Sequence, residues 1–109
     1  MSRALRRALQ ALLQPAPIQR DLFPEFSSPA EELARVLERA LSRDEDDHTA
    51  EQNEALARIQ AYFVQYAGVG HATFWDNLDD PRWDTLRELA ARALDEFGWP
   101  RDKPRPHDG

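Results

Sequence analysis

Apolar residues recur along this chain with the period of an α-helix in four stretches, and nowhere with the two-residue period of a β-strand. The first stretch, residues 3–14, is strongly two-faced. Arginines and glutamines fall on one face, and Pro15 and Pro17 end the pattern. The opposite, apolar face consists of Leu5, Ala8, Leu9, Leu12 and Leu13. The pattern predicts an amphipathic helix within residues 1–14.

A second helix is predicted to begin at Ser28. Ser28 suits the N-cap and Pro29 suits the first helical position, while Glu31 would complete a Ser-x-x-Glu capping box. The apolar stripe that follows ends near Ser42. Its members are Ala30, Leu33, Val36, Leu37, Ala40 and Leu41.

The third helix is predicted over residues 50–67. Thr49 and Gln52 can form a capping box at its start, and Gly68 stands where a glycine commonly ends a helix. Apolar side chains surround much of its circumference. We therefore expect this helix to lie centrally and to contact more than one neighbour.

The last helix has signals at both of its ends. Asp80 suits the N-cap and Pro81 suits the first helical position. Gly98 and Trp99 occupy the places of a Schellman motif, in which the residue after the glycine packs back on the helix. The preceding residues, 69–80, are expected to form a loop that contains one helical turn.

These elements predict an all-α fold without a sheet. The expected architecture is a small antiparallel helical bundle of three long helices, to which the amphipathic N-terminal helix is added. A length of 109 residues suits one domain. The predicted organisation is a helix at 1–14, an extended proline-rich linker at 15–26, a helical domain at 27–99 and a disordered tail at 100–109.

Composition excludes several classes of function. The chain has no cysteine, which excludes disulfides, thiolate metal sites and thiol catalysis. No apolar run approaches the roughly 20 residues that cross a bilayer, so no transmembrane segment is expected. The N-terminal stretch is too short and too polar for a signal-peptide core, which favours a cytoplasmic location.

The net charge of −6 is unevenly distributed. Residues 1–20 carry four arginines and no acid, whereas residues 21–80 carry fourteen acids against four arginines. An acidic body argues against direct nucleic-acid binding by the folded domain. It favours a basic protein partner, or serves solubility alone.

Two acidic clusters are candidate contact sites. The first lacks the glycine and glutamate of a calcium-binding EF-hand loop, so we interpret it as a solvated helix connection or as an electrostatic docking patch. The second cluster precedes the last helix, where negative charge stabilises a helix N-terminus. The clusters consist of Asp44, Glu45, Asp46 and Asp47, and of Asp76, Asp79 and Asp80.

Eight of the ten aromatic residues lie between Tyr62 and Trp99. Helical phasing assigns most of them to the core. Phe74 and Trp75 remain, because they fall on the predicted loop beside the second acidic cluster. Large aromatics dominate binding sites as well as cores. The sequence therefore predicts one loop-borne contact surface made by Phe74, Trp75, Asp76, Asp79 and Asp80.

His71 and Asp76 form the one candidate catalytic pair, because a histidine with an orienting carboxylate is the minimum for a general base. The competing interpretation is that His71 buttresses the turn after Gly68. No serine lies beyond Ser42 to complete a triad. His48 lacks further ligands in a zinc-binding pattern, and no metal or cofactor is predicted.

The function predicted first is a non-enzymatic acidic helical protein-interaction module, of inhibitor, immunity or adaptor type, with a basic protein partner. The alternatives are a small hydrolase or metal-dependent domain centred on His71 and Asp76, and a phage or transcriptional regulator that uses the N-terminal arginine arm. The N-terminal helix is expected to join the bundle, to dock on a partner or to lie on a membrane surface. If its leucine face is left exposed, a homodimer through Leu5, Leu9 and Leu12 is expected.

Overall fold

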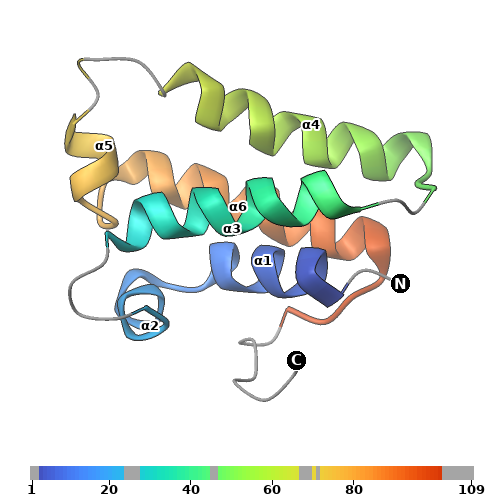
Figure 1. Ribbon diagram of the computed structural model, residues 1–109, viewed down its shortest axis with the longest axis horizontal. Coiled ribbons are helices and arrows are strands. Elements are labelled where there is room, and N and C mark those ends of the chain that lie inside the picture. Colours follow the sequence, from blue (N-terminus) through green and yellow to red (C-terminus); the bar gives the residue numbers. More distant parts are fainter. Residues whose placement is uncertain (1–2, 24–27, 45–46, 67–69, 71, 102–109) are drawn as a thin grey trace.

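The computed structural model describes residues 3–23, 28–44, 47–66, 70 and 72–101, and every regular element within them is a helix. The predicted all-α class is thus confirmed. The radius of gyration, 13.2 Å, is that of a compact chain of 109 residues. The helices, labelled in Figure 1, are α1 (Arg3–Leu13), α2 (Ala16–Asp21), α3 (Pro29–Arg43), α4 (Ala50–Gln65), α5 (Ala72–Asp76) and α6 (Pro81–Phe97).

One of the two predicted capping boxes forms. At the start of α4, the Thr49 side chain accepts a bond from the Gln52 backbone N–H at 3.1 Å, and Gln52 Oε1 accepts one from the Thr49 N–H at 2.9 Å. Ser28 is the N-cap residue of α3, but its side chain makes no capping hydrogen bond, so the box predicted with Glu31 is wrong. Pro29 begins that helix with its own fixed φ angle.

Both predicted ends of α6 are confirmed. Asp80 Oδ1 accepts a hydrogen bond from the Arg82 backbone N–H at 3.0 Å, as an N-cap residue does. At the other end, Gly98 takes the left-handed conformation with φ of 69°. The Trp99 N–H then donates to the Leu94 carbonyl at 2.9 Å, which completes the Schellman motif.

The extended linker predicted at 15–26 contains a helix instead, α2. Pro15 is its N-cap residue and Pro17 lies in its first turn, where a missing N–H has no intrahelical partner to lose. Gln19, at 0% exposure, donates from Nε2 to the Leu12 carbonyl at 2.8 Å. The carbonyls of a last helical turn need such partners, so this bond holds α2 against the end of α1.

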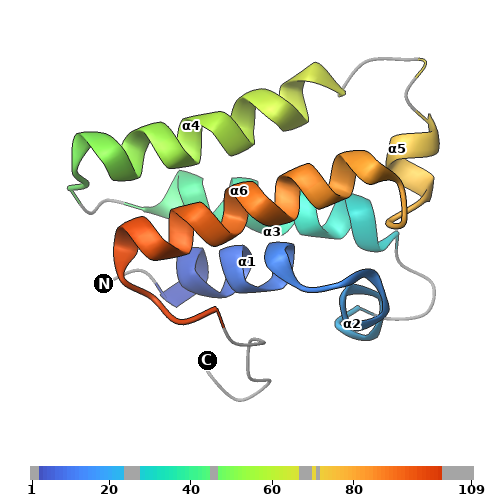
Figure 2. The ribbon, with the colours of Figure 1, turned by 180° about the vertical axis from the view of Figure 1, so that it is seen from behind.

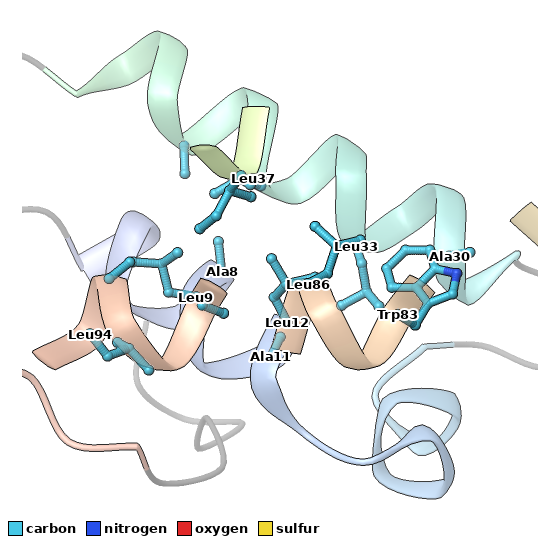
Figure 3. Close-up of a cluster of buried hydrophobic side chains, with 14 of the residues drawn as sticks. Ala8, Leu9, Ala11, Leu12, Ala30, Leu33, Leu37, Trp83, Leu86 and Leu94 are labelled. Carbon is cyan, nitrogen blue, oxygen red and sulfur yellow. The ribbon is translucent and has the colours of Figure 1, made fainter. Parts of the chain in front are cut away.

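The core is built around α6, which packs against α1 and α4, while α1 also packs against α3 (Figures 1 and 2). Leu5, Leu9 and Leu12 of α1 are all 0% exposed. The leucine face of the N-terminal helix is therefore covered by the chain itself, and a dimer through these residues would require α1 to leave the core. In Figure 3 the buried side chains of α1, α3 and α6 meet, among them Leu9, Leu12, Leu33, Leu37, Trp83, Leu86 and Leu94.

The central position expected for the third long helix is not found. α4 lies at one side of the molecule and packs mainly against α6 (Figures 1 and 2). Leu56 and Ile59 are its buried residues, whereas Ala57, Ala61 and Val64 are exposed. Alanine favours helix formation even when it is exposed. The alanines around α4 therefore do not imply that a second helix packs against it.

Candidate partner-binding groove

The described acids of the two clusters predicted as contact sites lie at opposite ends of α6. His48 follows the first cluster. Its ring packs edge to face against the ring of Phe97, with the ring centroids 5.0 Å apart, and Phe97 lies in the last turn of α6. Asp80, from the second cluster, is the N-cap residue of the same helix. The 17 residues of α6 make a helix about 25 Å long. The described acids of the two clusters therefore do not form one surface.

Within the first cluster, the structure describes Asp44 and Asp47, whereas Glu45 and Asp46 lie outside the described residues. Asp44 is hydrogen-bonded to His48 Nε2, and 6% of its side chain is exposed. This carboxylate belongs to the folded connection between α3 and α4. Asp47 is exposed, and it is the described acid of this cluster that a partner can reach.

In the second cluster, two of the three carboxylates have arginine partners within the chain. Asp79 Oδ2 accepts a bond from Arg20 Nη2 at 2.7 Å, which ties α2 to the segment before α6. The Arg82 guanidinium donates to both oxygens of Asp80 at 2.8 Å. The pKa of Asp80 is lowered to about 2. The hydrogen bonds from the Arg82 side chain are the largest cause, and the bond from the Arg82 backbone N–H is the next largest. Asp76 is exposed.

The two aromatic residues predicted as contacts have different environments. Phe74 is 0% exposed and stacks on Trp83 with ring centroids 4.7 Å apart, so it belongs to the core and not to a surface. Trp75 is half-buried, stacks on Phe63 at 6.0 Å and donates its indole N–H to the Tyr66 carbonyl at 2.7 Å. Of these two aromatic residues, only Trp75 can therefore contribute to the predicted contact surface.

Trp75 lines a groove between α3 and α4. α3 packs chiefly against α1 and α4 chiefly against α6, so the two helices are not drawn tightly together. The hollow between them has a volume of about 350 Å³. It is lined by Ala34, Leu37, Glu38, Leu41, Gln60, Phe63, Val64 and Trp75.

The described residues that line this α3–α4 groove are apolar apart from one carboxylate, Glu38, and one amide, Gln60. Val64 is 72% exposed, and it is the large hydrophobic residue that the described part of the chain leaves exposed. The indole N–H of Trp75 is already bonded to a backbone carbonyl, so its ring presents apolar surface. The described part of the groove therefore offers hydrophobic contact with one negative charge and no cation.

A second groove, of about 280 Å³, lies between α4 and α6 and is much more polar. Two of its carboxylates are paired, Glu54 with Arg58 at 2.7 Å and Asp95 with Arg101. The other two carboxylates, Glu51 and Glu96, have no ion-pair partner among the described residues. The residues that line it are Glu51, Glu54, Ala55, Arg58, Leu89, Arg92, Asp95 and Glu96.

Trp75, predicted from the sequence as a contact residue of a loop, lines the α3–α4 groove, whereas the groove residues Leu41, Phe63, Val64 and Glu38 were not predicted. A usable signal was present, because the apolar character of residues 50–67 extends beyond one buried stripe. From the sequence alone, this excess predicts a second buried face. Of the three exposed residues that make up this excess, Ala57, Ala61 and Val64, only Val64 is among the described residues that line the groove.

His71, the predicted partner of Asp76, lies outside the described residues, so the hydrolase alternative stays a prediction from the sequence. Among the described residues, no three His, Asp or Glu side chains are grouped so as to hold a metal ion. None of the described helices combines the length and the apolar character needed to cross a membrane. The arginines of the predicted N-terminal arm belong to α1, which packs on the core.

Comparison of the chain with protein-family models, with curated proteins and with solved structures finds no match. Its function is therefore inferred from the groove and from the charges around it.

Proposed function

We propose that this protein is a non-enzymatic helical interaction module, of inhibitor, immunity or adaptor type, that binds a basic protein partner through the α3–α4 groove. The observation that carries the proposal is an apolar groove with an exposed valine, Val64, at its edge. Contiguous apolar surface on a soluble domain commonly marks an interaction site. A cytoplasmic location and a bundle of antiparallel helices as the scaffold are parts of the same proposal.

The dimensions of the groove suit side chains of a protein partner. Its volume of about 350 Å³ is at the low end of the range of small-molecule pockets, which is enough for about one or two large apolar side chains. Burial of one such side chain contributes about 1.5–3 kcal/mol. An amphipathic helix that lies in a groove with its apolar side chains inserted is a common way to use such a surface.

Charge favours a basic partner over an acidic one. The described lining of the groove includes Glu38 and no cationic side chain, and the chain as a whole carries a net charge of −6. Exposed acids at some distance, such as Asp47, would mainly raise the association rate and its dependence on salt. The apolar groove would supply most of the affinity.

Val64→Asp tests this proposal with little risk to the fold, because 72% of the valine is exposed. Ala61→Asp is the matched control, since Ala61 is exposed on the same helix but does not line the groove. Each protein is immobilised and used to capture partners from extracts of the source organism. We expect a basic protein to be retained by the wild type and by Ala61→Asp, and at least tenfold less by Val64→Asp. Equal capture by all three proteins, or no captured protein, would overturn the proposal.

A further inference from the structure

α3 also borders a third groove, on the side where it packs against α1. Small side chains account for the hollow, because Ala4 and Ala11 of α1 and Ala40 of α3 leave a volume of about 300 Å³. Leu22, Phe23 and Val36 line it as well. These three are half-buried and pack against the core, so the groove has a fixed apolar floor.

Among the described residues that line this α1–α3 groove, the charged ones are Arg7, Arg39 and Arg43, and none is a carboxylate. Elsewhere in the described chain, six arginines pair with carboxylates at 2.9 Å or less. Arg39 and Arg43, both exposed, have no hydrogen-bond or ion-pair partner among the described residues. Three cations are thus collected around one apolar hollow in a chain whose net charge is −6.

Helix stabilisation accounts for one of these cations. Arg43 is in the last turn of α3, where a positive charge interacts favourably with the helix dipole. That effect falls off within the last turn. Arg39 lies one turn earlier and Arg7 lies in the middle of α1, so the dipole does not explain why they face the same groove.

We propose that the α1–α3 groove binds an acidic amphipathic helix of a partner protein. The groove runs along α1 from Ala4 to Ala11, a length of about 10 Å or two helical turns. That length accommodates apolar side chains at positions i, i+4 and i+7 of a docked helix. Carboxylates beside them meet the guanidinium groups, which bind carboxylates with two parallel hydrogen bonds.

This site differs from the α3–α4 groove in the sign of its charge. Among the described lining residues, the α3–α4 groove has one carboxylate and no cation, whereas the α1–α3 groove has three cations and no carboxylate. The two surfaces share α3 and select partners of opposite charge. Failure of one proposal leaves the other intact, because each is tested with its own variants.

The probe is a synthetic capped peptide of about 14 residues with leucine at i, i+4 and i+7 and glutamate at the flanking positions. Binding to the full chain is followed by fluorescence anisotropy at low and at high salt. A lysine version with the same leucines and a scrambled acidic peptide are the controls. We expect the acidic helix to bind, the lysine version not to bind, and the scrambled peptide to bind at least tenfold more weakly.

The protein variants are the double substitution Arg39→Glu with Arg43→Glu, and Arg92→Glu as the matched control. Like Arg39 and Arg43, Arg92 is exposed and has no ion-pair partner among the described residues, but it lines the α4–α6 groove. Thermal melting confirms that both variants fold. We expect the double variant to bind the acidic peptide at least tenfold more weakly than the wild type, and Arg92→Glu to bind it unchanged.

Several outcomes would overturn the proposal. These are an equal effect of the two sets of substitutions, equal binding of the scrambled peptide, and no binding at about 1 mM peptide. Binding to anionic phosphatidylglycerol vesicles without binding to the peptide would assign the arginines to a lipid surface instead. Self-association that depends on Arg39 and Arg43, without peptide binding, would assign the groove to a second copy of the chain.

Discussion

Arg87 of α6 donates a hydrogen bond to the side chain of Gln19 of α2, from Nη2 to Oε1 at 2.8 Å. The same guanidinium donates to the Gln14 carbonyl at 2.9 Å, just after α1, and to the Leu78 carbonyl at 2.8 Å, before α6. Gln19 is 0% exposed, so its side-chain oxygen has no access to water. One arginine thus joins α2 and the end of α1 to α6.

Arg87→Ala should destabilise the fold, because it leaves the buried Gln19 oxygen without a donor. We expect the free energy of unfolding to fall by about 2–3 kcal/mol. This is the typical cost when a buried polar group loses its hydrogen bonds to a charged donor and is left unpaired. Urea unfolding measures the change. Arg92→Ala, on the same helix and exposed, is the control and should change stability by less than about 0.5 kcal/mol. Equal losses in the two variants would show that the Arg87 bonds contribute nothing.

Gly98 ends α6 with a φ of 69°, a conformation that other residues adopt at a cost. A Cβ placed there would meet no atom within 4 Å, so the cost of a substitution comes from the backbone alone. Gly98→Ala should therefore lower the free energy of unfolding by about 1–2 kcal/mol. Gly98→Asn should cost less, because asparagine tolerates the left-handed conformation better than alanine. Thermal melting of the two variants checks the order, and a greater loss for asparagine would contradict it.

Asp80 makes stability depend on pH in the acidic range. Its pKa is lowered from 3.8 to about 2 by the Arg82 hydrogen bonds. A carboxylate whose pKa is depressed in the folded state stabilises the fold above the unfolded value and ceases to do so as the pH falls through the folded value. The contribution is therefore fully present above about pH 4 and is lost toward about pH 2.

Asp80→Asn tests this dependence while it retains a good N-cap residue. We expect the variant to be less stable than the wild type at pH 6, because it lacks the ionised partner of Arg82. The difference between the two proteins should shrink as the pH is lowered from 5 to 2 in urea-unfolding series. A difference that does not change with pH would show that the ion pair does not stabilise the fold.

The parts of the fold that the sequence predicts well are those decided by local contacts. Thr49 and Gln52 are three residues apart, and Gly98 is adjacent to Trp99, so their capping motifs are visible in a short stretch of sequence. α2 is held partly by a distant residue. Its Gln19 accepts a hydrogen bond from Arg87, which lies 68 residues further along the chain. A short stretch of sequence cannot predict such a bond.

The candidate groove was harder to predict, because it depends on which helices pack together. Phe74 and Trp75 are neighbours in a five-residue helix, too short for a periodic pattern to separate the buried residue from the half-exposed one. Val64 is exposed because α4 packs mainly on α6 and leaves its other side open toward α3. Similarly, the partner of Asp79 is Arg20, 59 residues away.

The leucine face of α1 gives a last prediction, on stability and oligomeric state together. Leu9 is 0% exposed, so Leu9→Ala removes buried side-chain volume and should lower the free energy of unfolding by about 2–5 kcal/mol. Val64→Ala is the control, and should have little effect because Val64 is 72% exposed. If α1 stays in the core, sedimentation should give the same molecular mass for the wild type and for both variants. A wild-type dimer that becomes a monomer in Leu9→Ala would show instead that the leucine face pairs between two chains, as the sequence also allows.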